Sequence, residues 1–127
     1  MTKVAPVSDL AAMLAGMAPV LHPQAWAFAV LVKGSPLPAD MFAAICEDEG
    51  TTAIVPASPD DQAFARITLM VHSALEGVGL TAAVSGALAR AGIACNIVAG
   101  FHHDHLFVPW ARRDEALDIL QNLARAG

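Results

Sequence analysis

The chain has 127 residues, a length typical of one domain or of two very small subdomains that share a core. Hydrophobic residues make up 56% of it and charged residues 15%, which leaves little charged surface to keep copies apart, so self-association is expected. The formal net charge is −5, and only Arg112 and Arg113 are adjacent among the seven lysines and arginines. Nucleic acid is therefore not expected as a partner, because phosphate backbones are bound by clustered cations.

Residues 8–19 are predicted to form a short helix. Ser8 and Asp9 can cap its start, apolar residues recur at i, i+3, i+4 and i+7 from Leu10, and Gly16 and Pro19 end it. The same uncharged run also has the outline of a secretory signal peptide, but Asp9 and Pro19 fit a helix better. No stretch of the sequence is long and apolar enough to span a membrane.

The next segments are predicted to be strand, helix and strand. Bulky and small residues alternate over residues 25–32, which indicates a strand, and the glycine and prolines at 34–38 end it. Residues 39–47 have the apolar spacing of a short helix. The β-branched residues at 51–55 indicate a second strand.

The second half of the chain shows the clearest periodicity. Apolar and other residues alternate over residues 67–72, 93–99 and 105–108, which predicts three strands. Helical spacing over residues 80–91 and 112–125 predicts two amphipathic helices. The predicted order is therefore strand, helix, strand, strand, helix.

Four segments of this half carry a family resemblance. VHS at 71–73, GLTAAV at 79–84 and LARAGIACNI at 88–97 resemble the ACT domain, the amino-acid-sensing regulatory module of aspartokinases and related enzymes. Together with GFHHDHLFVP at 100–109, they resemble a family of small stand-alone bacterial ACT-like proteins whose role is not established. The resemblance covers about half of the chain and implies a fold and a class of ligand rather than a pathway.

The resemblance implies a ferredoxin-like α/β (α+β) fold with two ACT-like subdomains, antiparallel-rich sheets and helices on one face. Residues 56–61 are predicted as a hinge, so we expect a degenerate ACT-like subdomain at residues 1–61 and a second subdomain at residues 62–127. A full ACT unit ends in a further strand that the second half lacks. We expect the first half to fill that sheet edge, with a partner chain as the alternative, and we expect a homodimer.

The loop at residues 73–79 is the main candidate for a ligand site. It could also be an ordinary connection in which Gly77 and Gly79 merely permit unusual backbone angles. ACT proteins use this loop and the facing start of the next strand for their ligands, and free amides at a helix start suit the carboxylate of an amino acid. The candidate ligand-binding residues are Ser73, Ala74, Leu75, Glu76, Gly77, Val78, Gly79, Leu80, Asn96, Ile97, His102, His103 and Asp104.

Asn96 is a poor strand former within an apolar run, so its amide needs a partner. The resemblance implies that the Asn96 side chain meets the amino group of the ligand, although an acidic residue is common at this place in ACT sites. The alternative is a hydrogen bond that fixes the sheet. The turn at residues 102–104 is then expected to form a flexible rim over the ligand.

Metal binding is the second interpretation of the histidine-rich turn. His103 and His105 would share one face of a strand, but a tetrahedral metal site needs further ligands, and His72 or Glu76 would have to come from elsewhere. Catalysis has weak support because the neighbours His72 and Ser73 point to opposite faces of a strand. We therefore expect no enzyme and no cofactor.

The function predicted from the sequence is a stand-alone regulatory module that binds a small ligand, an amino acid, and acts through self-association or an enzyme partner. A metal-binding protein is the alternative, and a small enzyme comes third. Cys46 and Cys95 are interpreted as small core residues, which favours a reducing, cytoplasmic location without a membrane partner.

Overall fold

The computed structural model describes residues 9–75 and 77–126 and contains one six-stranded sheet in the order β2-β3-β1-β4-β6-β5. All neighbouring strands are antiparallel. The elements are α1 (Leu10–Ala15), β1 (Pro19–Leu31), β2 (Ala43–Glu47), β3 (Gly50–Pro56), β4 (Phe64–Leu69), α2 (Leu80–Arg90), β5 (Asn96–Ala99), β6 (Asp104–Pro109), a 3-10 turn (Trp110–Arg112) and α3 (Arg113–Ala126). Within the described residues, no helix is both long and apolar enough to cross a membrane.

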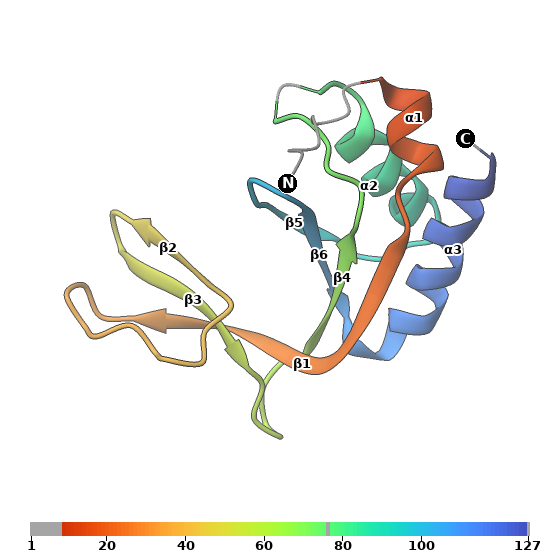
Figure 1. Ribbon diagram of the computed structural model, residues 1–127. Coiled ribbons are helices and arrows are strands. Elements are labelled where there is room, and N and C mark those ends of the chain that lie inside the picture. Colours follow the sequence, from red (N-terminus) through yellow and green to blue (C-terminus); the bar gives the residue numbers. More distant parts are fainter. Residues whose placement is uncertain (1–8, 76, 127) are drawn as a thin grey trace.

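The sheet has two parts, which we call the body and the arm. The body consists of the first half of β1 with β4, β6 and β5, and Figure 1 shows α1, α2 and α3 on one side of it. The arm consists of the second half of β1 with β3 and β2, and it extends away from the helices. The body is the expected α+β arrangement with helices on one face.

β1 supplies the strand that the second half of the chain lacks. Its first residues pair with β4, from Pro19 opposite Leu69 onward, on the edge that β6 leaves free. The register shifts between Leu21 and Ala25, and Pro23, which has no backbone N–H to donate, lies inside this bulge. Beyond the bulge β1 continues into the arm, so one long strand joins both parts of the sheet. The prediction that the first half fills the edge is confirmed.

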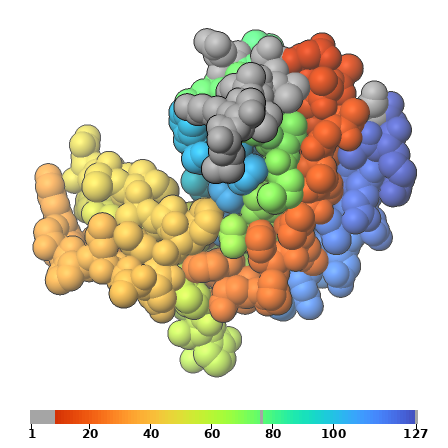
Figure 2. Space-filling model, viewed as in Figure 1, coloured from red at the N-terminus to blue at the C-terminus, as the bar shows by residue number. Residues whose placement is uncertain are grey.

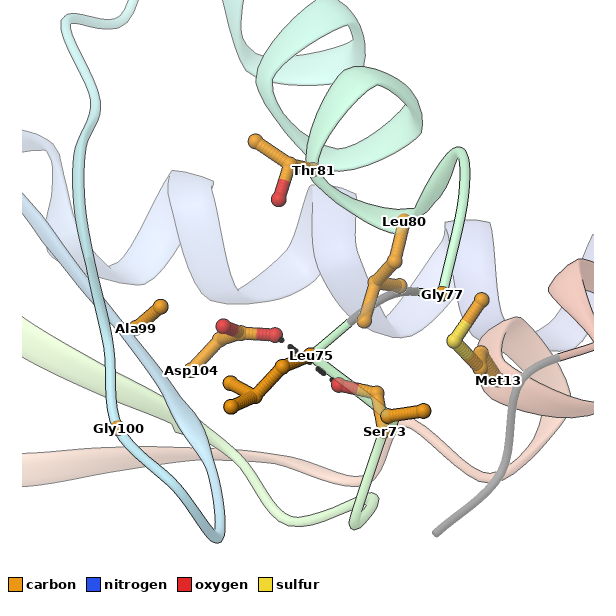
Figure 3. A pocket seen from close by; sticks show the side chains of 10 residues that line it. Met13, Ser73, Leu75, Gly77, Leu80, Thr81, Ala99, Gly100 and Asp104 are labelled. Carbon is orange, nitrogen blue, oxygen red and sulfur yellow. Dashed lines mark hydrogen bonds between the residues drawn. The ribbon is translucent and has the colours of Figure 1, made fainter.

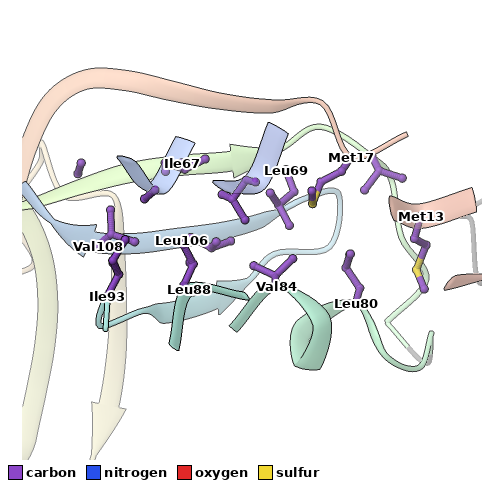
Figure 4. Packing of buried hydrophobic residues seen from close by; sticks show 14 residues of the cluster. Met13, Met17, Ile67, Leu69, Leu80, Val84, Leu88, Ile93, Leu106 and Val108 are labelled. Atoms are coloured by element: carbon purple, nitrogen blue, oxygen red, sulfur yellow. The ribbon is translucent and has the colours of Figure 1, made fainter. Parts of the chain in front are cut away.

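The hydrophobic core lies between the helices and one face of the body. Figure 4 shows side chains of β4 and β6 meeting those of α2 and α1. Its fully buried members include Met13, Met17, Ala65, Ile67, Val84, Leu88, Leu106, Val108, Ala116 and Leu120. Because successive residues of a strand point to opposite faces, the residues between these on β4 and β6 lie on the face without helices.

The prediction of a helix at residues 39–47 is wrong. Residues 43–47 form β2, which pairs with β3 from Ala43 opposite Ile54 to Glu47 opposite Gly50. The segment whose apolar residues have helical spacing is instead extended and forms hydrogen bonds with β3. The Phe42 amide also donates to the Ile54 carbonyl. At Gly50, φ is +148° and an added Cβ would lie 2.8 Å from the Leu31 carbonyl oxygen, so this turn needs a glycine.

The elements of the second half agree with the sequence apart from their ends. α2 and α3 start and end within one residue of the predicted ranges 80–91 and 112–125. β5 is shorter than the predicted strand at 93–99, because the Ile93 amide donates to the Leu88 carbonyl and still belongs to the end of α2. Gly92, at φ +71°, turns the chain there.

Candidate functional site

A small cavity of about 90 Å³ lies at the end of the body where α2 begins, shown in Figure 3. This volume is enough for several water molecules or a small polar group. The loop after β4, the first turn of α2, the hairpin between β5 and β6, and α1 contribute its walls. The lining residues are Met13, Ser73, Ala74, Leu75, Gly77, Leu80, Thr81, Ala99, Gly100 and Asp104.

The start of α2 forms the positively polarised wall of this pocket. Gly79 is its N-cap, has φ +104°, and no side chain caps the helix. The first hydrogen bond of the helix runs from the Ala83 amide to the Gly79 carbonyl, so the amides of the first turn have no acceptor within the helix. Together with the helix dipole, such amides bind anionic groups such as carboxylates.

α1 holds the loop in place from behind. An added Cβ at Gly79 would lie 3.1 Å from the Leu10 side chain, and one at Gly77 would lie 3.0 Å from the Ala74 carbonyl oxygen and 3.3 Å from the Met13 sulfur. Both glycines therefore allow the loop to approach its neighbours closely. α1 itself starts at Asp9, whose carboxylate accepts from the Ala12 amide at 3.0 Å, so the predicted Asp9 cap is confirmed.

Asp104 provides the opposite, negatively charged wall. It is the first residue of β6, opposite Ala99 of β5, and the Gly100 amide donates to the His103 carbonyl to close the hairpin between them. The Ser73 hydroxyl donates to the Asp104 carboxylate at 3.3 Å, drawn as a dashed line in Figure 3. The pocket thus combines amide donors, two hydroxyls and one carboxylate.

The structure brings together only part of the predicted site. Ser73, Ala74, Leu75, Gly77, Leu80 and Asp104 line the pocket, whereas Gly79 caps α2 and Glu76 lies outside the described residues. Val78 is 82% exposed and is not among the lining residues. Met13, Ala99 and Gly100 line the pocket but were not predicted. Thr81 also lines it, in the first helical turn whose amides were predicted to bind an anion, although its side chain was not named as a ligand-binding group.

Asn96 does not reach the pocket. It lies at the opposite end of β5 from Ala99, paired with Phe107, and its side chain is exposed. β5 starts at Asn96 and only its far end borders this pocket, so binding of a ligand by Asn96 stays a prediction that this pocket does not use. Its neighbour Ile97 instead packs against the hydrophobic core.

The predicted rim residues lie beside the pocket rather than in its wall. His102 is exposed and stacks on His72, with ring centroids 5.6 Å apart. His103 is half-buried, and its Nδ1 has no hydrogen-bond partner. Neither residue lines the pocket. The hairpin contributes Gly100 and Asp104 instead.

Metal binding and thiol chemistry can be compared with the side chains that the structure describes. Within the described residues, no three His, Cys, Asp or Glu side chains are grouped as a metal site would require. Burial raises the pKa of the Cys95 thiol to about 11, which disfavours the reactive thiolate.

Comparisons with known proteins address the family and the fold. Models of the ACT domain match residues 5–66 and residues 65–122. A search of curated proteins finds no match. A Vibrio cholerae protein of unknown function, described as a possible transport protein, is 35% identical, has a TM-score of 0.79, and matches over 91% of this chain and 95% of its own.

Two more distant structures share the fold. An Agrobacterium tumefaciens protein is 19% identical with a TM-score of 0.64, over 80% of this chain and 84% of its own. The regulatory subunit of aspartate kinase from Thermus flavus is 12% identical with a TM-score of 0.60, over 83% of this chain and 95% of its own. Taken with the two family matches and the sheet order, these similarities show that the chain belongs to the ACT domain family.

Proposed function

We propose that this protein is a regulatory module that binds a free amino acid in the pocket between α2 and Asp104. ACT domains are regulatory modules that bind small ligands, which supports a regulatory rather than a catalytic role. The observation that carries the proposal is the pairing of an uncapped helix start with a carboxylate across one small cavity. An amino acid has the complementary charges at its two ends.

The carboxylate of the ligand would accept from the amides at the start of α2 and from the Thr81 hydroxyl. Its ammonium group would donate to the Asp104 carboxylate, which Ser73 already holds in position. Met13, Leu75 and Leu80 give the pocket an apolar side. A ligand with a short or apolar side chain therefore fits this lining best.

The binding test uses a thermal-shift screen of the full chain against the common amino acids, followed by calorimetry on the ligand that raises the melting temperature. Asp104→Asn should weaken that ligand by about tenfold to a hundredfold, because one hydrogen bond to a charged group contributes roughly 1.5–3 kcal/mol. The matched control is Asp118→Asn, an exposed aspartate on α3, which should bind like the wild type.

The proposal fails if no amino acid stabilises the protein, or if Asp104→Asn folds and binds as tightly as the wild type. A ligand that bridges Asn96 instead would be lost in Asn96→Ala and retained in Asp104→Asn. The two variants therefore distinguish the pocket from the site expected from the sequence.

Ligand binding would act through self-association or an enzyme partner. β5 is an outer strand of the sheet, and its last residue, Ala99, lines the pocket. A homodimer that pairs β5 with β5 would place the ligand beside the seam and link occupancy to assembly. Light scattering should then show a dimer whose dissociation constant changes when the ligand is added. A monomer at all concentrations, with and without ligand, would contradict this part of the proposal.

A further inference from the structure

A second polar cluster lies on the face of the body that carries no helix. Arg66 and Thr68 of β4 alternate with the core residues of that strand, and His105 of β6 lies directly opposite Thr68. His22, from the bulge of β1, reaches the same threonine. We call these four residues the Arg66 cluster.

Thr68 connects the members of the Arg66 cluster. Its Oγ1 is 2.8 Å from His22 Nε2, 2.9 Å from His105 Nδ1 and 3.2 Å from Arg66 Nη1, and the residue is only 3% exposed. Arg66 Nη1 also donates to His105 Nδ1 at 3.4 Å, so the Nδ1 of His105 is an acceptor. The consistent assignment has the Thr68 hydroxyl donating to His105 while it accepts from Arg66 and His22, with both imidazoles neutral.

Arg66 is a half-buried cation without a counterion in the described part of the chain. The ion pair found there joins Arg112 and Glu115, far from this face, and none involves Arg66. The Arg66 Nε is buried and donates to nothing, although a guanidinium in this setting normally meets a carboxylate. The neighbours of this charge are histidines rather than acids, in a chain whose net charge is −5.

Aromatic rings enclose the guanidinium. Its central carbon lies 4.5 Å from the centroid of the Phe42 ring and 5.9 Å from that of the Trp26 ring. Trp26 is 8% exposed, and its indole Nε1 is a second buried donor without an acceptor. Phe42 precedes β2, so this enclosure lies at the root of the arm. Figure 2 shows the surface hollowed between the yellow arm and the green and blue strands of the body.

We propose that the Arg66 cluster is a second ligand site, which binds the oxyanion group of a small molecule, a carboxylate or a phosphate. The unpartnered donors are of the kind that an oxyanion satisfies, and Nε with the adjacent Nη2 forms an edge that matches two oxygens of one anion. Phe42 lies over the guanidinium and must shift for the anion to reach Nε. The site is separate from the amino-acid pocket, because His105 and Asp104 are successive residues of β6 and point to opposite faces.

The proposal is tested by following the Arg66 Nε–H and Trp26 Nε1–H signals directly in nitrogen–proton NMR spectra of the full chain. Inorganic phosphate and acetate are titrated separately, with sodium chloride at equal ionic strength as the reference. Either anion should cause a saturable shift of both signals. The anion that binds more tightly shows whether the site prefers a phosphate or a carboxylate. Chloride should cause none.

Arg66→Gln should abolish this binding, and Thr68→Val, which disturbs the position of Arg66 and His105, should weaken it by roughly tenfold. Arg90→Gln, which removes an exposed arginine of α2, is the charge-matched control and should bind like the wild type. Asp104→Asn should also retain anion binding at Arg66. A failure of the proposed amino-acid pocket can therefore be distinguished from a failure of the Arg66 site.

Wild-type spectra decide the matter even if Arg66→Gln does not fold. The proposal is overturned if neither anion shifts the two signals beyond chloride, or if the shifts appear only at the amide of Thr81 at the start of α2. It is also overturned if a folded Arg66→Gln binds as tightly as the wild type. In each of those outcomes Arg66 would serve only to fasten Phe42 and the arm to the body.

Discussion

The body and the arm are parts of one sheet, but they are stabilised in different ways. In the body, α2 and α3 cover one face, and Leu88, Leu106 and Leu120 are completely buried. In the arm, Val30 of β1 and Val32, which directly follows that strand, are 83% and 80% exposed. A regular strand pattern therefore does not by itself indicate burial, because a covering layer is needed as well.

The two candidate sites lie in these two different surroundings. The amino-acid pocket is built at the start of α2 and rests on the packed helices of the body. The Arg66 cluster lies at the root of the arm, where Phe42 contacts both Arg66 and His105. A movement of the arm would therefore alter the Arg66 cluster directly and the pocket only through β6.

The largest expected effect is on the stability of the body. Leu106→Ala should lower the free energy of unfolding by about 2–5 kcal/mol, because it opens a cavity in a fully buried site between Ile67 and Ile97. Val30→Ala, at the exposed end of the arm, should change it by less than about 0.5 kcal/mol. Urea unfolding of both variants measures the contrast. Similar losses from the two substitutions would show that the arm is packed as firmly as the body.

The body was predictable because its sequence carries two independent signals. Leu80, Val84 and Leu88 recur at helical spacing, and they are the buried residues of α2. Ile67 and Leu69 alternate with polar residues, and they face the core. Where the periodic apolar face of an element is covered by another layer, the sequence pattern and the tertiary structure indicate the same secondary structure.

The arm was less predictable because its pairing partners decide its structure. Phe42, Ile45 and Cys46 have helical spacing, yet the chain there turns at Gly50 and pairs β2 with β3. The spacing of three apolar residues is too short a signal to outweigh a ladder of strand hydrogen bonds. No feature of residues 39–47 alone distinguishes the two outcomes.

The pocket was predicted in part, for a related reason. The loop after β4 and Asp104 were named from local features, namely the glycines, the helix start and the turn, together with the resemblance to ACT domains. Asn96 was named from the resemblance to ACT domains, and the register of β5 places it at the end of the strand away from this pocket. The Arg66 cluster was missed altogether, because Arg66, His22 and His105 are brought together by strand register and no sequence motif marks it.

A smaller effect on the free energy of unfolding is expected where the body meets the arm, and this effect depends on pH. Burial, followed by the charge of Arg66 and the neighbours His103 and His22, lowers the pKa of His105 from 6.5 to about 4, and burial and Arg66 also lower the pKa of His22. Between pH 6.5 and 4 the unfolded chain therefore binds a proton at His105 that the folded chain does not. This contribution to stability is complete above pH 6.5 and is lost as the pH falls toward 4.

Urea unfolding at several pH values from 7 to 4 should therefore show a smaller acid-dependent loss of stability in His105→Gln than in the wild type. Glutamine can still accept from the Thr68 hydroxyl, and His102→Gln, at an exposed histidine, is the matched control with the wild-type slope. Equal slopes in all three proteins would contradict the assignment of a neutral His105. Burial is the main cause of the lowered pKa of His105 and the Arg66 charge adds to it, so an anion bound at Arg66 would offset only the second contribution. Saturating phosphate or acetate should therefore partly reduce the acid-dependent loss in the wild type and have less effect in Arg66→Gln. The acid-dependent loss of stability should thus depend on whether an anion occupies the Arg66 cluster. If neither anion changes the slope of the wild type, the pH dependence is independent of anion binding.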